Sequence, residues 1–461
     1  MKKILCMLTA ALTLIACNNA GKQTPVDDGI DYATFEYKVD RFADIEILRY
    51  PVPGFNALTL QQKELVYYLS QAALEGRDIL WDQHNRYNLT IRRVCEGLYE
   101  NYMGDKSTEN WKLFETYLKQ IWMANGIHHH YSEDKILPGF PQDYFVSIVK
   151  SVDPGRMPFR DGMAADETLK EILPVMFDPN VMPKRMNQAA GADIVATSAV
   201  NFYEGVTQKE VEEFYNAMKD PNDNTPVSYG LNSKVVKENG QVTEQVWKLG
   251  GMYDKAIERI IGWLEKAEAV AESDQQKEII RALISFYQTG DLETFDDYSV
   301  KWVKDTNSQV DFINGFIETY TDPLGMKGSW EALVNFKSLE ASERTRIISE
   351  NAQWFEDNSP IDDRFKKEEV KGVSAKVVTA AILGGDTYPA TPIGINLPNA
   401  NWIRRDHGSK SVTIDNITFA YAKAAEGNGF REEFMWSDTE RERAKQYGTI
   451  TDNLHTDLHE C

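Results

Sequence analysis

Helical periodicity dominates the pattern of apolar and polar residues from Thr59 onward. Apolar side chains recur at intervals of three and four over residues 60–69, and Thr59 stands before them as an N-cap. The same spacing predicts further helices over residues 79–99, 110–123, 208–219, 246–272, 274–287, 293–303 and 342–355. We therefore expect helices to form most of the regular structure.

Strand patterns are fewer and more scattered. Residues 35–42 alternate between apolar and polar side chains, which is typical of a strand. Two clusters of turn residues between Asp220 and Gly240 bracket further short strands. Residues 373–383 are rich in β-branched side chains and end at a pair of glycines, which favours a buried strand. The predicted fold class is α+β and predominantly helical.

Residues 1–17 have the features of a bacterial signal peptide. Lys2 and Lys3 precede an apolar run that is too short to span a bilayer. Leu14-Ile-Ala-Cys17 resembles a lipobox, which predicts cleavage before Cys17 and a lipid on its sulfur. Ordinary secretion is the alternative. We expect an exported lipoprotein on the periplasmic or cell-surface side of a membrane, with residues 18–30 as a flexible tether.

Composition limits the class of protein. The chain has 461 residues, of which 42% are apolar, so it can bury a large core in two or three domains. Its formal net charge of −21 would repel phosphates, so no nucleic-acid partner is expected. Cys95 and Cys461, the cysteines outside the amino-terminal segment, are too few for a disulfide framework.

Three consecutive histidines, His128 to His130, form a conspicuous cluster. Neighbouring side chains diverge on a regular helix or strand, so three adjacent imidazoles do not face one metal ion. Gly126 before the cluster and Pro138-Gly139 after it indicate a loop. We therefore assign no catalytic metal to these histidines.

Two other groups of polar residues are ambiguous from their spacing alone. Glu318 and Tyr320 are two apart and would share one face of a strand, which is typical of a solvated face. Asn396 and Asn399 bracket Pro398 in a predicted loop, where asparagine amides often bind the local backbone. Binding of a ligand is the alternative for both groups.

The carboxyl end carries half of a zinc-peptidase motif. Ser437 and Glu440 form a capping box for a helix that we expect to be interrupted near Gly448 and to restart near residue 451. His459 is followed by Glu460, as in motifs where a histidine binds zinc and the adjacent glutamate acts as general base. The second histidine of such a motif is absent from these 461 residues.

Three stretches together resemble the dipeptidyl peptidase III family of zinc exopeptidases. They are Asp457-Leu-His459-Glu460-Cys461, Gly315-Phe-Ile-Glu318-Thr-Tyr320-Thr-Asp-Pro-Leu-Gly325, and Pro392-Ile-Gly-Ile-Asn396-Leu-Pro-Asn399. Bacterial members carry His-Glu-Cys-Leu-Gly-His, which this sequence matches up to its last residue. The resemblance runs from about residue 30 and covers about the first two thirds of a member, so we expect a carboxy-terminally truncated chain.

The resemblance implies roles for individual residues. His459 would bind a single Zn²⁺, whose remaining ligands lie beyond residue 461, and Glu460 would be the catalytic base. Glu318 would bind the free ammonium of an oligopeptide substrate, and Tyr320 would contact the carbonyl near the cleaved bond. Asn396 and Asn399 would hold the first peptide unit. These roles are assigned to the matching positions of this chain.

The resemblance also implies an architecture of two lobes around a cleft. A mixed lobe with a β-barrel core would take residues 31–338 and 375–425, and an incomplete helical zinc lobe would take 339–374 and 426–461. We expect a monomeric zinc-dependent dipeptidyl peptidase that acts on oligopeptides but is inactive as this 461-residue chain. The alternatives are a non-catalytic peptide-binding envelope lipoprotein and a helical envelope scaffold.

Overall fold

The computed structural model describes residues 29–159, 164–338, 346–370, 373–389, 391–427 and 429–460 of the chain. Within these ranges, the side chains of residues 373–375, 431, 449, 457, 459 and 460 are not described. The predicted signal peptide, Cys17 and most of the predicted tether therefore lie outside the described residues. His459 and Glu460 are described only as helical backbone, and Cys461 is outside the description.

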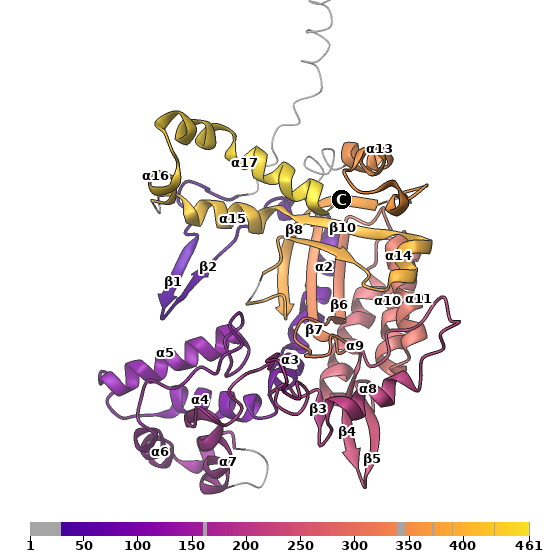
Figure 1. Ribbon diagram of the computed structural model, residues 1–461. Helices are drawn as coiled ribbons and strands as arrows, with labels where there is room; N and C mark the ends of the chain where they lie inside the picture. The colour runs from indigo at the N-terminus through magenta and orange to yellow at the C-terminus, as the bar shows by residue number, and fades with distance from the viewer. Residues whose placement is uncertain are drawn as a thin grey trace, which may run out of the picture.

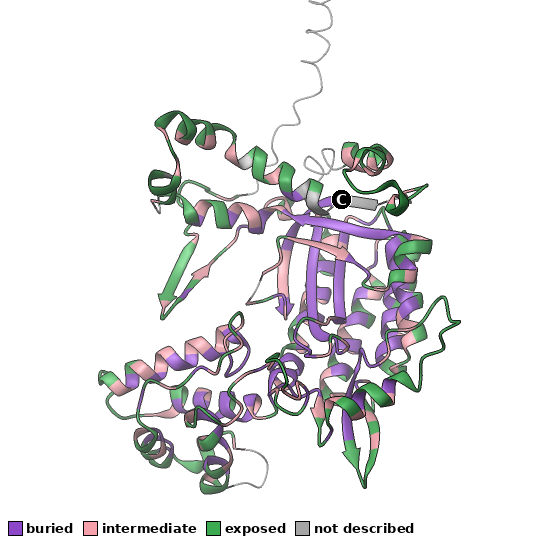
Figure 2. Ribbon diagram, viewed as in Figure 1, coloured by how far each residue is buried: buried purple, intermediate pink, exposed green. Residues whose placement is uncertain are grey.

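A five-stranded sheet lies at the centre of the molecule (Figure 1). Its strands, in spatial order, are β6 (Val310–Glu318), β7 (Ser329–Lys337), β8 (Val373–Gly385), β10 (Ser409–Ile414) and β9 (Gly394–Leu397). β8 and β10 run parallel, whereas the other neighbouring pairs are antiparallel. The strand predicted over residues 373–383 is thus confirmed as β8, in the middle of the sheet. β6 and β7 are almost entirely buried, as Figure 2 shows.

The sheet is curled but does not close into the predicted β-barrel. Among the described residues, no backbone ladder joins the edge strands β6 and β9. Side chains bridge these edges instead, since the Asn399 amide donates to Glu318 over 3.0 Å. Trp302 donates its indole N–H to the carbonyl of Phe312 and to Asp311 in edge strand β6. The Phe312 carbonyl therefore already accepts a hydrogen bond and is not available to a further strand. This is one physical reason why the β6 edge stays open.

Helices cover the sheet and share its largest hydrophobic cluster. α2 (Leu60–Glu75) packs on β6, β7 and β8 and against α9 (Asp254–Ala269). α10 (Asp274–Thr289) and α11 (Leu292–Lys304) complete this layer. Thr59 caps α2 through a full capping box with Gln62, which confirms the predicted start of this helix.

A second hydrophobic cluster lies within a separate group of helices. These are α3 (Arg77–His84), α4 (Asn88–Asn101), α5 (Glu109–Ala124), α6 (Gln142–Ser151) and α7 (Ala165–Phe177). Figure 1 shows α4 to α7 beside the sheet, with α3 leading into them. The predicted mixed lobe of residues 31–338 and 375–425 therefore contains more than one core, since a third, smaller cluster includes Val211, Tyr215 and Val235. Its buried free thiol, Cys95, belongs to the second one.

Smaller elements complete the chain. β1 (Lys38–Phe42) and β2 (Ile45–Leu48) form a hairpin, which confirms a strand within residues 35–42. β3 (Tyr203–Glu204), β4 (Ser233–Glu238) and β5 (Gln241–Val246) form a three-stranded sheet beside α8 (Gln208–Asn216). Short helical turns occur at η1 (Phe55–Ala57), η2 (Pro154–Arg156) and η3 (Asp363–Phe365). No helix among the described residues is both long and apolar enough to cross a membrane.

The carboxy-terminal helices leave several large apolar side chains exposed. They are α13 (Ala352–Asn358), α14 (Asn401–His407), α15 (Asp415–Ala425), α16 (Phe430–Phe434) and α17 (Asp438–Glu460). α17 contacts β9 and β10. Large apolar side chains remain exposed on α13 and around α16, including Trp436 with 92% exposure, and these helices are mostly green in Figure 2.

Several predicted helix boundaries are wrong. Of the helix predicted over residues 342–355, residues 342–345 lie outside the described residues, and a turn at Asn351 separates residues 346–350 from α13. The helix predicted over residues 79–99 is broken between α3 and α4, because the Asn85 carboxamide accepts the Tyr87 N–H in a local turn. The helix predicted over 246–272 begins only at α9, since β5 extends to Val246. The expected interruption near Gly448 is absent from α17. A single glycine costs about 1 kcal/mol in a helix, which does not by itself break a long one.

Candidate functional site

One cavity collects the four predicted substrate-binding residues. It has a volume of about 580 Å³ and lies at the open edge of the central sheet, where Glu318, Tyr320, Asn396 and Asn399 all line it. Further lining comes from His130, Glu133, Arg185, Thr321, Glu331, Asp386, Thr387, Pro392, Gly394, Ile395 and Arg404. We call this space the carboxylate cavity, after its four acidic residues.

Glu318 and Tyr320 reach the cavity from the end of β6. The strand ends at Glu318, and Tyr320 lies in the following turn with 77% of its surface exposed. Asp322 stabilises this turn by accepting the backbone N–H groups of Met326 and Lys327 over 2.7 and 2.9 Å. Glu318 and Tyr320 were predicted to share one face of a strand. They do line the same cavity, but Glu318 lies at the end of β6 and Tyr320 in the turn that follows.

Asn396 and Asn399 come from β9 and the turn after it. Arg404 of α14 fixes this turn, because its guanidinium donates to the carbonyls of Asn396 and Pro398, each over 2.6 Å. The Asn396 side-chain oxygen is buried without a hydrogen-bond partner in the described structure, and is free to accept one from a ligand. Asn399 uses its amide on Glu318, so the local-backbone alternative does not account for this side chain.

The Glu318 carboxyl is held in a partly desolvated position. Burial raises the pKa of Glu318 above its ordinary value, and the charge of Asp386 adds to this, whereas the hydrogen bond from Asn399 opposes it. An ammonium ion beside this group would favour the ionised form. The pair of Glu318 and Asn399 is thus arranged as an oriented acceptor for a cation.

Sequence analysis missed three carboxyls of the cavity: Glu133, Glu331 and Asp386. Glu331 is the third residue of β7, and burial followed by the charges of Glu318 and Asp386 raises its pKa well above the ordinary value. Burial also raises the pKa of Asp386, which follows β8. The sequence signal that could have pointed to Glu331 is its position as one acidic residue inside the otherwise apolar run Trp330-Glu-Ala-Leu-Val334.

The positive charges of the cavity are largely committed to other contacts. Arg185 binds Glu133 through two hydrogen bonds of 2.6 Å and also contacts the ring of buried His84. Burial, and then the charge of Arg185, lower the pKa of His84 well below its ordinary value, so this ring is neutral at pH 7. Four carboxyls therefore face two guanidinium groups, a balance that favours a bound cation.

The three consecutive histidines occupy three different environments. His128 is buried and contacts the Met182 carbonyl over 2.8 Å, while His129 accepts the N–H groups of the turn that follows it. His130 lines the carboxylate cavity, and burial lowers its pKa to about 4. The rings of His129 and His130 stack with their centroids 4.5 Å apart, so the divergence expected of adjacent side chains does not hold for this pair. Of the three histidines, His130 lines the carboxylate cavity.

The zinc half of the predicted site is not tested by this structure. His459 and Glu460 form the last turn of α17 as backbone alone, and Cys17 lies outside the described residues. In the described part of the chain, no group of three or more His, Cys, Asp or Glu side chains could hold a metal ion. The described side chains therefore do not make up a zinc site. The roles of His459, Glu460 and Cys17 stay predictions.

Comparisons with known proteins show the family of this chain and the type of its fold. The model of Peptidase family M49 matches residues 190–461, and the chain belongs to this family. M49 peptidases are zinc metallopeptidases. The resemblance stated from the three motifs is thereby confirmed.

Curated relatives are distant and longer. Dipeptidyl peptidase 3 of Dictyostelium discoideum is 23% identical over 392 residues, covering 80% of this chain and 54% of that protein. The Nematostella vectensis protein of the same name is 22% identical over 438 residues, covering 85% and 58%. In Rattus norvegicus the match is 28% over 184 residues, 40% of this chain and 24% of that protein. The chain thus spans little more than half the length of the first two.

Solved structures support the same fold. Dipeptidyl peptidase III from Caldithrix abyssi superposes with a TM-score of 0.56 at 18% identity, covering 80% of this chain and 57% of that one. The enzyme from Corallococcus sp. strain EGB gives a TM-score of 0.57 at 18% identity, covering 79% and 56%. At this identity the likeness shows a mixed helix-and-sheet fold of this type and no more.

Proposed function

We propose that the protein is a zinc-dependent dipeptidyl peptidase and that its carboxylate cavity binds the amino terminus of oligopeptides. One observation carries the proposal: Asn399 orients Glu318 inside a cavity where carboxyls outnumber guanidinium groups. The ammonium of a peptide is a compact cation with three donors, so it matches such a group of acceptors. Membership of family M49 supports the reaction class.

Dipeptide release follows from this mode of binding. If Glu318 holds the ammonium, two extended residues reach about 7 Å from it before the bond to be cleaved. The free acceptor of Asn396 and the exposed ring of Tyr320 lie along the same cavity and can bind the first peptide unit. Recognition would then rest on the backbone and terminus, which predicts wide tolerance of side chains.

Zinc belongs to the proposal through the motif His459-Glu460 and the family. We propose His459 as a ligand and Glu460 as the general base. Because the described side chains do not make up a metal site, no chemical step is assigned to His459 or Glu460.

Exposed apolar helices support a further part of the proposal, the two-lobe architecture. Trp354, Phe430, Phe434 and Trp436 are all exposed on or beside α13 and α16. Exposed apolar side chains gathered on one helix usually mark a surface that packs against another element. We propose that α13 and α16, each with its own exposed apolar side chains, belong to the helical zinc lobe.

A lipid anchor at Cys17 is proposed from the lipobox pattern alone. Expression of the chain with its amino-terminal segment in a bacterial host tests it. The protein should fractionate with membranes, and Cys17→Ser should release it. Membrane association that is unchanged in Cys17→Ser would refute the anchor.

Hydrolysis is tested with a chain that also carries the further zinc ligands, because none beyond His459 is proposed within these 461 residues. The substrates are a dipeptidyl-naphthylamide and an oligopeptide whose products are identified by mass spectrometry. The proposal expects dipeptides as the first products, with loss of activity under a chelator and recovery when Zn²⁺ is added back. Release of single residues, or activity that resists the chelator, would refute it. Peptide binding without any hydrolysis would favour the alternative, a non-catalytic peptide-binding envelope lipoprotein.

A further inference from the structure

A second cavity lies directly behind the carboxylate cavity, and the same strand ends separate the two. Along β6 and its extension, Glu318 and Tyr320 face the carboxylate cavity, whereas Ile317 and Thr319 face the second space. At the other sheet edge, Asn396 faces the first cavity and Leu397 the second. We call the second space the seam cavity, because it fills the gap between edge strands β6 and β9.

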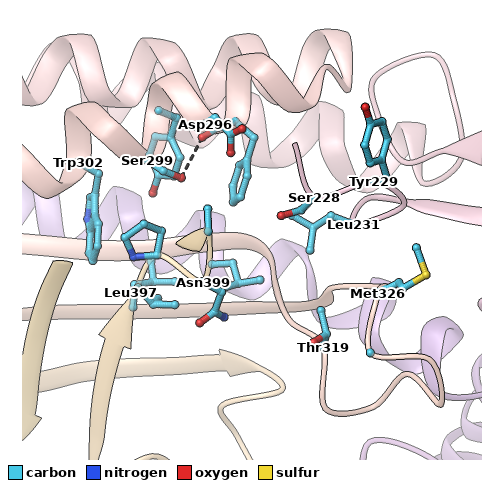
Figure 3. A pocket seen from close by; sticks show the side chains of 17 residues that line it. Ser228, Tyr229, Leu231, Asp296, Ser299, Trp302, Thr319, Met326, Leu397 and Asn399 are labelled. Carbon is cyan, nitrogen blue, oxygen red and sulfur yellow. Dashed lines mark hydrogen bonds between the residues drawn. The ribbon is translucent and has the colours of Figure 1, made fainter. Parts of the chain in front are cut away.

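The seam cavity is lined mainly by apolar side chains and has a volume of about 290 Å³. α11 forms its roof with Phe295, Tyr298 and Trp302, and Ile313 and Leu397 line the sheet side. Figure 3 shows Asp296 and Ser299 descending from α11, with Thr319 and Asn399 opposite them.

Asp296 places one acidic group at the border of this apolar space, because it also lines a neighbouring open pocket together with Glu293 and Trp402. Asp296 is 7% exposed, and none of the described residues that line the seam cavity is Lys, Arg or His. Burial raises the pKa of Asp296 to about 7; the Trp402 side chain opposes this shift and Glu293 adds to it. A buried carboxyl without a cationic partner is unfavourable, and a ligand that supplies the cation would relieve that cost.

From this geometry we infer that the seam cavity is a binding site for a small amphipathic amine, separate from the peptide site. The apolar body of such a ligand would lie against Phe295, Trp302 and Leu397, with its ammonium at Asp296. Acids of the same size are excluded, because the lining offers no positive charge. The volume is at the low end for ligand pockets, which limits the ligand to about one ring or one branched chain.

The test uses three probes with one apolar body: 2-phenylethylamine, 2-phenylethanol and phenylacetate. Their binding to the chain is measured by calorimetry and by saturation-transfer NMR at neutral pH. The amine should bind, the alcohol should bind more weakly, and phenylacetate should not bind. Equal binding of amine and phenylacetate would overturn the inference.

Variants then locate the bound amine. Asp296→Asn should weaken amine binding by about ten- to a hundredfold, the worth of a buried charged hydrogen bond. Asp297→Asn is the matched control: it removes the same charge from the next, exposed residue of α11 and should leave the affinity unchanged. Glu318→Gln removes the ammonium acceptor of the carboxylate cavity, so amine binding that survives in this variant and is lost in Asp296→Asn belongs to the seam cavity. Complete loss of binding in Glu318→Gln, or unchanged binding in Asp296→Asn, would overturn the inference.

A filling variant keeps the inference testable if Asp296→Asn does not fold. Ala400 lines the seam cavity and is partly exposed, so Ala400→Phe should block the space from its edge. This variant should lose both the amine and the alcohol while keeping its thermal melting cooperative. Full retention of amine binding in a folded Ala400→Phe protein would overturn the inference.

Discussion

Replacement of Glu318 by glutamine tests whether this carboxylate binds a peptide ammonium. The change keeps the shape of the side chain and its hydrogen bond with Asn399 but removes the charge. A hydrogen bond to a charged group contributes about 1.5–3 kcal/mol, which is about a ten- to 150-fold change in Kd. We expect a value inside this range rather than complete loss, because Glu331 and Asp386 keep the cavity acidic.

The assay is a thermodynamic cycle in which both the protein and the amino terminus of the peptide are changed. Calorimetry measures a tripeptide with a free amino terminus and the same tripeptide with an acetylated one, each against the wild-type chain and Glu318→Gln. The free peptide should lose affinity in the variant, whereas the acetylated peptide should bind weakly to both proteins. Glu368→Gln, at an exposed position that does not line the cavity, is the matched control and should change neither affinity.

Two results would refute this reasoning. If Glu318→Gln weakened both peptides equally, the residue would act on the shape of the cavity and not on the ammonium. If neither affinity changed, the cation would be bound by another group. Thermal melts of the variant distinguish either result from misfolding.

Three further predictions concern charge in the same cavity. Affinity for a free amino terminus should fall on acidification, and because the pKa of Glu318 is raised, the fall should begin at a higher pH than for an ordinary glutamate; calorimetry between pH 4 and pH 8 checks this. Glu331→Gln should raise the melting temperature at neutral pH. The pKa of Glu331 is higher in the folded than in the unfolded chain, so its stabilising effect is present at acid pH and lost as pH rises; the gain from glutamine should therefore disappear at acid pH. Arg185→Met should destabilise the chain by about 3–5 kcal/mol, since it leaves the Glu133 carboxylate partly buried and unpaired. Lys184→Met breaks the exposed neighbouring pair with Asp134 and should cost less than about 1 kcal/mol; equal losses in the two variants by urea unfolding would contradict this argument.

The candidate site was partly visible in the sequence because four of its residues lie in two short motifs. Spacing alone left Glu318 and Tyr320, and Asn396 and Asn399, ambiguous, and the resemblance of these motifs to the family selected both pairs without a structure. Glu331 and Asp386 carry no such motif. They became site residues only because β7 and β8 are adjacent strands of a curled sheet, which brings distant parts of the chain to one edge.

The sequence by itself determined the local elements and the family of this protein. Spacing and capping predicted helix α2 at Thr59, and β-branched residues predicted strand β8, because both signals act over a few neighbouring residues. Only the tertiary structure decided that the sheet stays open and that two cavities lie on either side of β6 and β9. Strand pairing and burial depend on contacts between residues far apart in the chain, and periodicity within a segment does not specify those contacts.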